Sequence, residues 1–212
     1  MPMLDMRAGR PQLVSIVVKG SIKSMTEQKG INLDFNLQGR EVANLKEITG
    51  QSLPLKGEYA LSGKLSDPAP QNYHVDNLNF KLGTNSIAGK VKLNLGKEKF
   101  GLTTDLAAPG FNLQPVTLPA LEKISRIEDL GPFKLAFELS KAGKKLALNN
   151  LDFHFGREDL IDVSLKGTVA DLSPVQGMKL EFTAKGSNIS NFQKVGGPEI
   201  QFEGAFNISG QF

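Results

Sequence analysis

The feature that most constrains the fold is a correspondence of the chain with itself. "VVKGSIKSMTEQKGINLDFNLQG" at 17–39 matches "SLKGTVADLSPVQGMKLEFTAKG" at 164–186. We call the displacement that brings position 17 onto position 164 the long shift. When 1–65 is aligned with 148–212 at this shift, no gap is needed, 16 positions are identical and nearly all other apolar positions stay apolar. A fixed spacing of this kind predicts stacked units, each of which buries its apolar face with its neighbours.

A second, fainter correspondence runs at half the long shift. "NLNFKLG" at 77–83 resembles "NLDFHFG" at 150–156. We therefore expect one continuous repeat domain over residues 1–212, built from three units of similar length. The units are expected at about 1–73, about 74–147 and about 148–212, the last of them truncated.

Two-residue alternation of apolar and polar residues dominates each unit. It is clear in "INLDFNL" at 31–37, in "LKGEYALSGKL" at 55–65 and in "SIAGKVKLNL" at 86–95. Such alternation indicates strands with one buried and one solvated face, as in antiparallel sheets. Connections such as "LGTNS" and "LGKEK" are typical of hairpins. The chain is therefore expected to be mainly β, with about eleven strands.

Three short helical segments are predicted between the strands. They are "REVANLKEITG" at 40–50, "LPALEKISRIEDLG" at 118–131 and "SNISNFQKVGG" at 187–197. Their apolar residues recur at helical spacing, namely at Val42, Leu45 and Ile48, at Leu121, Ile124 and Ile127, and at Ile189, Phe192 and Val195. Each unit is expected to contain two strands, a short helix and two further strands.

The apolar face of such a sheet needs a cover. Eleven strands with roughly three inward apolar side chains each would leave about 30 groups in water, at a cost of about 1.5–3 kcal/mol apiece. The sheet could curl on itself, be covered by its helices, or hold a foreign apolar ligand such as an acyl chain. The inward residues are aliphatic or Phe, whereas a pocket for a defined metabolite has a few convergent polar groups. The pattern therefore favours a variable apolar occupant or the protein's own side chains.

Composition and charge exclude several classes of protein. The 25 basic and 22 acidic residues give a net charge of +3, and the basic residues are spread along the chain, which argues against a nucleic-acid partner. The absence of cysteine excludes disulfides and thiolate metal sites. No stretch approaches the ~18 apolar residues of a membrane span, and the first residues do not resemble a signal peptide. We expect a soluble piece of a longer protein.

Catalysis finds little support in the sequence. The two histidines, His74 and His154, have no metal-ligand spacing to each other or to a carboxylate pair. "GTNSIAGKV" and "GEYALSGKL" differ from a phosphate-binding loop in glycine spacing and in the residue after the lysine. No G-x-S-x-G motif is present. Glu158 and Asp159 are expected to lie solvated in a turn. We therefore expect no enzyme, no catalytic residue, no cofactor and no metal.

The strand motifs resemble the AsmA-like family of Gram-negative envelope proteins. The pattern is an apolar strand ending in Ser-Gly, as in "GEYALSGKLSD", then a "nLdf.lG" strand such as "NLNFKLG", then a "l.G.v.l.l" strand such as "IAGKVKLNL". "LGPFKLAFELSKAGKKLALNNLDFHFG" continues it, and a "G.nl..l" helix start follows at 110–113 and 186–189. The resemblance covers nearly the whole chain.

The resemblance implies an elongated, curved, taco-like sheet with a hydrophobic interior, part of a repeating β-groove. Such bridge-like lipid transfer proteins are anchored in the inner membrane by an N-terminal helix and project through the periplasm. They carry phospholipids toward the outer membrane or support its assembly, without catalytic residues. For this chain, which lacks the anchor helix, it implies a periplasmic lipid-handling module. Its partners would be phospholipid or another acyl-chain lipid, the membrane through flanking regions, and envelope proteins.

The predicted lipid-binding residues are the inward members of the alternating strands. They are Leu33, Phe35, Tyr59, Leu61, Leu78, Phe80, Val91, Leu93, Leu102, Leu135, Phe137, Leu151, Phe153, Val163, Leu165, Leu180, Phe182, Phe206 and Ile208. The alternative is a structural or scaffolding segment whose interior is filled by its own helices and which acts through protein contacts. The two hypotheses differ in whether the helical residues fill the groove throughout.

Overall fold

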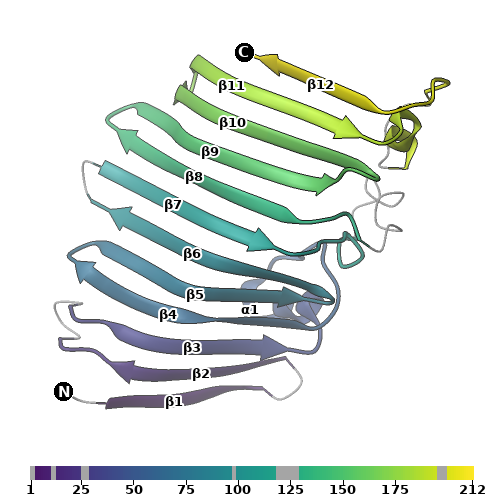
Figure 1. The fold of residues 1–212 in the computed structure, drawn as a ribbon. Helices are drawn as coiled ribbons and strands as arrows, with labels where there is room; N and C mark the ends of the chain where they lie inside the picture. Colours follow the sequence, from purple (N-terminus) through teal and green to yellow (C-terminus); the bar gives the residue numbers. More distant parts are fainter. Residues whose placement is uncertain (1–2, 11–12, 25–28, 97–98, 118–128, 195–199) are drawn as a thin grey trace.

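Twelve strands form one open antiparallel sheet in which every strand pairs with the next one in the chain (Figure 1). The computed structural model describes residues 3–10, 13–24, 29–96, 99–117, 129–194 and 200–212. The strands are β1 (Met3–Arg10), β2 (Val14–Ser21), β3 (Asn32–Gly39), β4 (Tyr59–Ala69), β5 (Asn72–Leu82), β6 (Asn85–Leu95), β7 (Lys99–Ala108), β8 (Phe133–Ala142), β9 (Lys145–Arg157), β10 (Ile161–Leu172), β11 (Val175–Gly186) and β12 (Phe206–Gln211). The mainly β, antiparallel prediction is confirmed.

Strand β3 illustrates why these residues form a sheet. Leu33, Phe35 and Leu37 are half-buried, whereas the asparagine, aspartate and glutamine residues between them are exposed. Because successive side chains of a strand point to opposite faces, this alternation assigns one apolar and one polar face. Both neighbours of β3 continue the assignment, since Leu37 pairs with Ile16 on β2 and with Leu61 on β4.

The sheet has one more strand than the sequence predicts. At the edge lies β1, in which every residue is exposed. Leu4, Met6 and Ala8 of this strand alternate with Asp5 and Arg7. With β1 counted, the first helical segment follows the third strand, so the predicted order of two strands, a helix and two strands is wrong.

Helical structure in the described residues is limited to single turns. The first predicted helix is divided into η1 (Val42–Leu45) and α1 (Lys46–Thr49), and it ends at Gly50 with φ +72°. The third becomes η3 (Ile189–Gln193), where the Asn188 side chain accepts a hydrogen bond from the Ser190 N–H. The segment with Leu121, Ile124 and Ile127 lies outside the described residues, as does Val195.

Two bulges interrupt the ladders at corresponding places. The β4–β5 register shifts between Ser62 and Lys64, and the β8–β9 register shifts between Ala136 and Glu138. Opposite them lie Asn77 and Asn150, which both have φ +52°. A bulge adds one residue to one strand and increases the local twist. It also exchanges the faces to which the residues on its two sides point.

The pairing registers recur along the chain. Leu4 pairs with Gly20 and Leu151 pairs with Gly167, so the long shift moves one pair onto the other. The β2–β3 and β3–β4 registers recur in the same way in β10–β11 and β11–β12. The recurrence therefore concerns strand pairing as well as residue type.

Most buried apolar residues of the described chain gather at one end of the strands; Val169, 4% exposed, lies toward the other end of β10. The end where they gather is the one at which β3, β5, β7, β9 and β11 finish and at which η1, α1 and η3 lie, on the right in Figure 1. We call it the capped end. Its buried residues are Leu13, Val14, Val42, Tyr59, Leu82, Ala108, Leu130, Leu160 and Ile161.

Candidate functional site

All nineteen predicted lipid-binding residues lie on one side of the sheet, which we call the apolar face. The assignment follows from the pairing registers, because directly paired residues of neighbouring strands point to the same face. One row of paired residues crosses β6 to β12: Gly89, Leu106, Leu135, Phe153, Leu165, Phe182 and Gly210. It holds no polar side chain.

A second row, farther from the capped end, crosses seven strands. It consists of Tyr73, Leu93, Leu102, Leu139, Leu148, Val169 and Met178 on β5 to β11. Only Leu93 and Leu102 of this row are among the predicted residues. The same face also carries residues that the prediction missed, namely Met6, Ile16, Val18, Leu37, Leu65, Val75, Ile87, Leu106 and Ala184. The alternation of apolar and polar residues within "VSIVVKG" and "NYHVD" could have identified some of these missed residues.

Most predicted residues of the apolar face are only half-buried. Of the nineteen residues, Tyr59 is buried, with 4% of its surface exposed, and Ile208 is 46% exposed; the others lie between these limits. The substantial contacts among the described elements join neighbouring strands, or η1 with α1. In the described parts of the chain, therefore, no second layer of strands or helices packs over the face.

The helical segments cover the capped end. Val42 of η1 packs with Tyr59 and Leu82, and Leu45 lies against this cluster. Ile48 of α1 is 58% exposed and does not fill the face. The described turns thus close one end of the apolar face and leave its length uncovered.

Segment η3 makes similar contacts near the last strand. The Phe192 and Phe206 rings lie 5.2 Å apart, centroid to centroid. The buried Asn191 amide donates to the backbone carbonyls of Asp159 and Leu160. These bonds hold the turn to the end of β9 without extending it along the apolar face.

Aromatic rings lie over glycines on this face. A Cβ atom on Gly39 would come within 2.5 Å of the Tyr59 ring, and one on Gly186 within 2.7 Å of the Phe206 ring. The Tyr59 hydroxyl also donates to the Leu13 carbonyl at 3.1 Å, and burial raises the pKa of this tyrosine. Glycine is required beneath each ring because any side chain there would displace it.

Thr104 is a polar residue in the middle of the apolar face. Thr104 lies between Val91 and Phe137 and is 8% exposed, and its Oγ1 has no hydrogen-bond partner among the described residues. Such a group costs free energy unless it finds a partner. Convergent polar groups of the kind that orient a defined metabolite are not gathered around it in the described structure.

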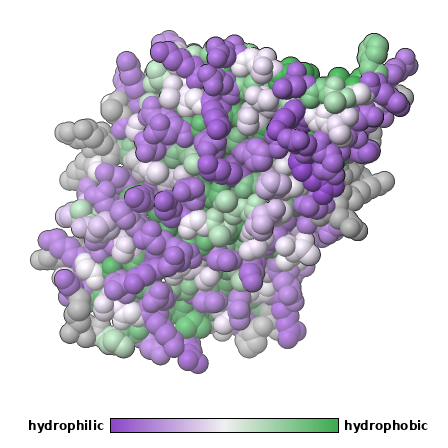
Figure 2. Space-filling view, viewed as in Figure 1, coloured by the Kyte–Doolittle hydropathy of each residue, from purple (hydrophilic) through white to green (hydrophobic). Residues whose placement is uncertain are grey.

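The opposite side, the polar face, carries exposed charges. The Lys134 Nζ lies 2.6 Å from Asp152 Oδ2, and the Lys90 Nζ lies 3.4 Å from Asp105 Oδ2. The hydrogen bond from Lys134 lowers the pKa of Asp152 and raises that of the lysine. Figure 2 looks onto this face, with α1 behind the sheet in the same view, and hydrophilic side chains dominate it. Exposed pairs of this kind contribute little stability.

The two histidines lie on the polar face. His154 Nε2 is 2.7 Å from Asp162 Oδ2 on the neighbouring strand, and His74 pairs with Lys92. No group of three or more His, Cys, Asp or Glu residues that could hold a metal ion occurs in the described ranges. Glu158 and Asp159 follow β9 at a turn, where Glu158 bonds to Lys185 and Asp159 lies 3.0 Å from Arg157.

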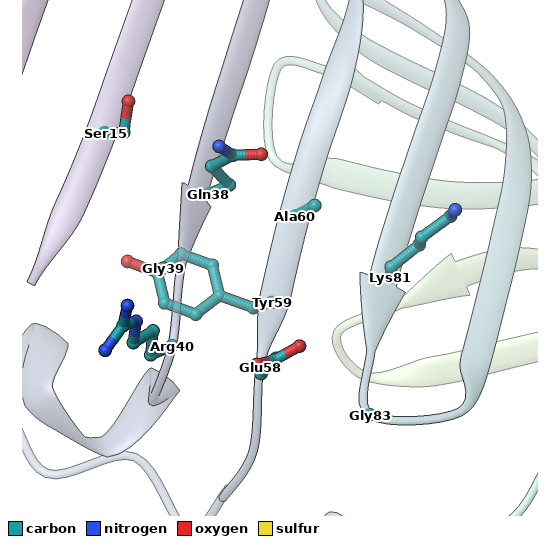
Figure 3. A pocket seen from close by; sticks show the side chains of 9 residues that line it. All are labelled: Ser15, Gln38, Gly39, Arg40, Glu58, Tyr59, Ala60, Lys81 and Gly83. Atoms are coloured by element: carbon teal, nitrogen blue, oxygen red, sulfur yellow. The ribbon is translucent and has the colours of Figure 1, made fainter.

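A hollow of about 360 Å³ opens beside the capped end (Figure 3). Its lining includes the polar-face residues Ser15, Gln38 and Lys81, together with Arg40 and Glu58. In Figure 3 the Arg40 and Lys81 side chains lie on opposite sides of the hollow, so their charges do not converge on one ligand. Tyr59 of the apolar face also lines the hollow, which includes no residue of the two apolar rows.

Comparisons with protein-family models, with curated proteins and with solved structures give no match. The resemblance to the AsmA-like family therefore rests on the strand motifs of the sequence. No helix in the described ranges is long and apolar enough to cross a membrane.

Proposed function

We propose that this chain is a non-catalytic lipid-handling module whose apolar face shields the acyl chains of phospholipid or a similar lipid. The observation that carries the proposal is the pair of apolar rows across β5 to β12, which are mostly half-buried and have no covering layer of strands or helices in the described residues. Soluble proteins seldom expose a contiguous apolar patch of this extent without an occupant.

The dimensions of the rows suit an acyl chain. Neighbouring strands lie about 4.8 Å apart, so seven strands span roughly 29 Å. The hydrocarbon layer of one leaflet is about 15 Å thick, half that of the bilayer core. Burial of each methylene contributes about 0.8 kcal/mol, so a 16-carbon chain could gain on the order of 12 kcal/mol before the loss of its conformational freedom.

The side chains of the apolar face favour a ligand that is apolar. Most side chains of the two rows are aliphatic or phenylalanine; Tyr73 and Met178 end the second row, and the polar Thr104 lies between the rows. A face of this kind binds acyl chains by area and shape. Head-group chemistry would then stay in solvent at the open end of the strands, away from η1 and η3.

The finer architecture belongs to the same proposal. We interpret the sheet as an elongated, curved groove built from the three units expected from the sequence, each with one short helix. The recurring registers, the bulges at Asn77 and Asn150, and the ring-over-glycine pairs support this interpretation. With the family resemblance, the module would stand in the periplasm, joined to membranes by flanking regions, and would support phospholipid transport and outer-membrane biogenesis.

Lipid extraction from gently purified protein tests the proposal. We expect phospholipid to be recovered in roughly molar amounts by mass spectrometry, and to be absent from a soluble control protein purified in parallel. Lipid at trace level, from protein that is folded and monodisperse without detergent, would contradict the proposal.

A scaffolding function is the second candidate. It is favoured by the packing of Val42 and Leu45 on the apolar face at the capped end. In that case the polar face and the strand ends would bind envelope proteins, and the apolar face would be filled by protein. Protein partners captured by cross-linking from the apolar face, in place of lipid, would favour this candidate.

A further inference from the structure

A basic side chain lies on the apolar face at the open end of the strands, the end opposite the capped end. Lys141 of β8 pairs with Phe100 on β7 and with Leu146 on β9. Phe100 pairs in turn with Leu95 on β6. We call these four residues the outer row, because they lie one step beyond the row that contains Leu102. Lys141 is exposed and Leu95 is 47% exposed, so the outer row borders solvent.

No other basic side chain that the structure describes in the strands has this position. The registers place the other lysines and Arg7 on the polar face, and they place Arg10 and Arg157 at the capped end. A lysine can lay its aliphatic stem along apolar neighbours while its ammonium group stays in water. Lys141 therefore brings a positive charge to the border of a surface that is otherwise mostly apolar.

The turn that follows Lys141 adds further positive charge. Strands β8 and β9 are joined through Gly143 and Lys144, and Ala142 pairs with Lys145 across this turn. Lys144 and Lys145 are exposed. The hairpin lies on the left in Figure 1, away from the helical turns. Three lysines thus occur within five residues at the open end of the strands.

A carboxylate lies beside these lysines, and its hydrogen bonds go to the backbone. Asp171 Oδ1 accepts hydrogen bonds from the Ser173 N–H at 3.1 Å and from the Leu146 N–H at 3.2 Å. These bonds, with a smaller contribution from the charge of Lys145, lower the pKa of Asp171. No ion pair joins Lys141 or Lys144 to another described residue. Their ammonium groups are therefore available to an external anion.

The length of the apolar face fits a lipid whose head group lies at these lysines. Along β7 the face runs from Leu106, near the capped end, to Phe100 in the outer row, six positions or roughly 20 Å away. The hydrocarbon layer of one leaflet is about 15 Å thick. An acyl chain that lies along the strands, with its methyl end toward the capped end, would therefore carry its ester and phosphate groups to the level of Lys141.

We propose that Lys141, with Lys144 of the adjoining turn, binds the phosphodiester of a lipid whose acyl chains lie on the apolar face, and that it favours lipids with a net negative head group. This inference rests on the proposed lipid-handling function and adds the class of lipid to it. A lysine ammonium group donates up to three hydrogen bonds, and those to phosphate oxygens are strengthened by charge. A zwitterionic head group carries its own cation, which the lysines repel. One lysine near an anionic lipid surface changes binding about fivefold.

Lipid uptake from mixed vesicles tests the proposal. The full chain is incubated with vesicles that contain equal amounts of phosphatidylglycerol and phosphatidylcholine with identical acyl chains. The protein is then separated from the vesicles, and its bound lipid is quantified by mass spectrometry. We expect the natural chain to hold phosphatidylglycerol in at least fivefold excess. Lys141→Gln should lower this excess about fivefold while total bound lipid stays within about twofold.

Lys92→Gln is the matched control. Lys92 is exposed and pairs with Thr103 on the polar face, so its substitution removes the same charge from the other side of the sheet. We expect this variant to keep the excess of phosphatidylglycerol, and all three proteins to have the same melting temperature. Equal losses of the excess in the two variants would indicate an effect of net charge alone and would overturn the proposal.

The remaining outcomes separate this inference from the proposed function. Lipid bound without head-group preference would overturn the inference alone, whereas a natural chain that takes up no lipid would overturn both. Inorganic phosphate in millimolar excess should leave phosphatidylglycerol bound, because it offers no acyl chain to the apolar face. Displacement of the lipid by phosphate would show that the lysines take a free anion and would overturn the assignment to a lipid head group.

Discussion

Gly167→Ala is expected to be among the most destabilising single substitutions in this sheet. Gly167 lies within β10 with φ +139°, and a Cβ atom there would stand 2.0 Å from the Lys179 carbonyl oxygen and 3.0 Å from the Leu180 Cα on β11. Both obstacles are backbone atoms of a paired strand, so no side-chain rotation relieves the clash. Strain at such a φ costs about 1–3 kcal/mol and forced overpacking costs about as much again.

The expected loss is therefore about 3 kcal/mol or more, which lowers the melting temperature of a domain of this size by roughly 6–12 °C. Thermal unfolding followed by circular dichroism measures it. Gly101→Ala on β7 is the matched control, because its Cβ would meet Asn94 at an ordinary 3.6 Å. Equal melting temperatures for the two variants would show that the close strand approach at Gly167 is absent.

The same prediction applies to the corresponding glycine. Gly20 has φ +142°, and its Cβ would stand 2.0 Å from the Asn32 carbonyl oxygen. Gly20→Ala is thus expected to destabilise the protein by a similar amount. Equal effects are expected at these two positions because both glycines occupy the same place in the strand pairing.

Leu102→Glu is expected to abolish lipid retention while the sheet stays folded. Leu102 lies in the row between Leu93 and Leu139, away from the capped end, and is half-buried. A carboxylate there would have to lose its hydration when an acyl chain covers it, which costs several kcal/mol. We expect the co-purified lipid to fall at least tenfold.

Thr103→Glu is the matched control. Thr103 is the next residue of β7, is also half-buried and pairs with Lys92 and Glu138 on the polar face. It adds the same charge to the same strand, so lipid content should stay near that of the natural chain. Melting temperatures of both variants establish that they are folded. Equal lipid loss in the two would contradict an acyl-binding role for the apolar face.

The sequence predicts the strands well where alternation is uninterrupted, as in β3 and β6, because a one-residue shift there would expose every apolar side chain. The predicted number of strands, about eleven, is one below the twelve of the sheet. The predicted helix at 40–50 becomes two single turns, because tertiary contacts of Val42 stabilise only the part that touches the sheet.

Membership of the apolar face is harder to predict than the strands are. Counting by two from Phe80 would put Val75 and Tyr73 on the polar face, but the bulge at Asn77 brings them to the apolar face. The bulge at Asn150 does the same for Leu148. A bulge is a change in backbone conformation at a single asparagine, and the alternation of apolar and polar residues does not reveal it.

Site-specific photo-cross-linking tests the central claim most directly, which is that the apolar face is the surface that lipid occupies. A photoreactive phenylalanine analogue placed at Phe35 or Phe137 reports on the apolar face of β3 and β8, and the same group at Asn36 or Glu138 reports on the polar face one residue away. We predict lipid adducts in cells from the first two positions and none from their neighbours. Adducts with protein alone, or lipid adducts equally from both faces, would contradict the account.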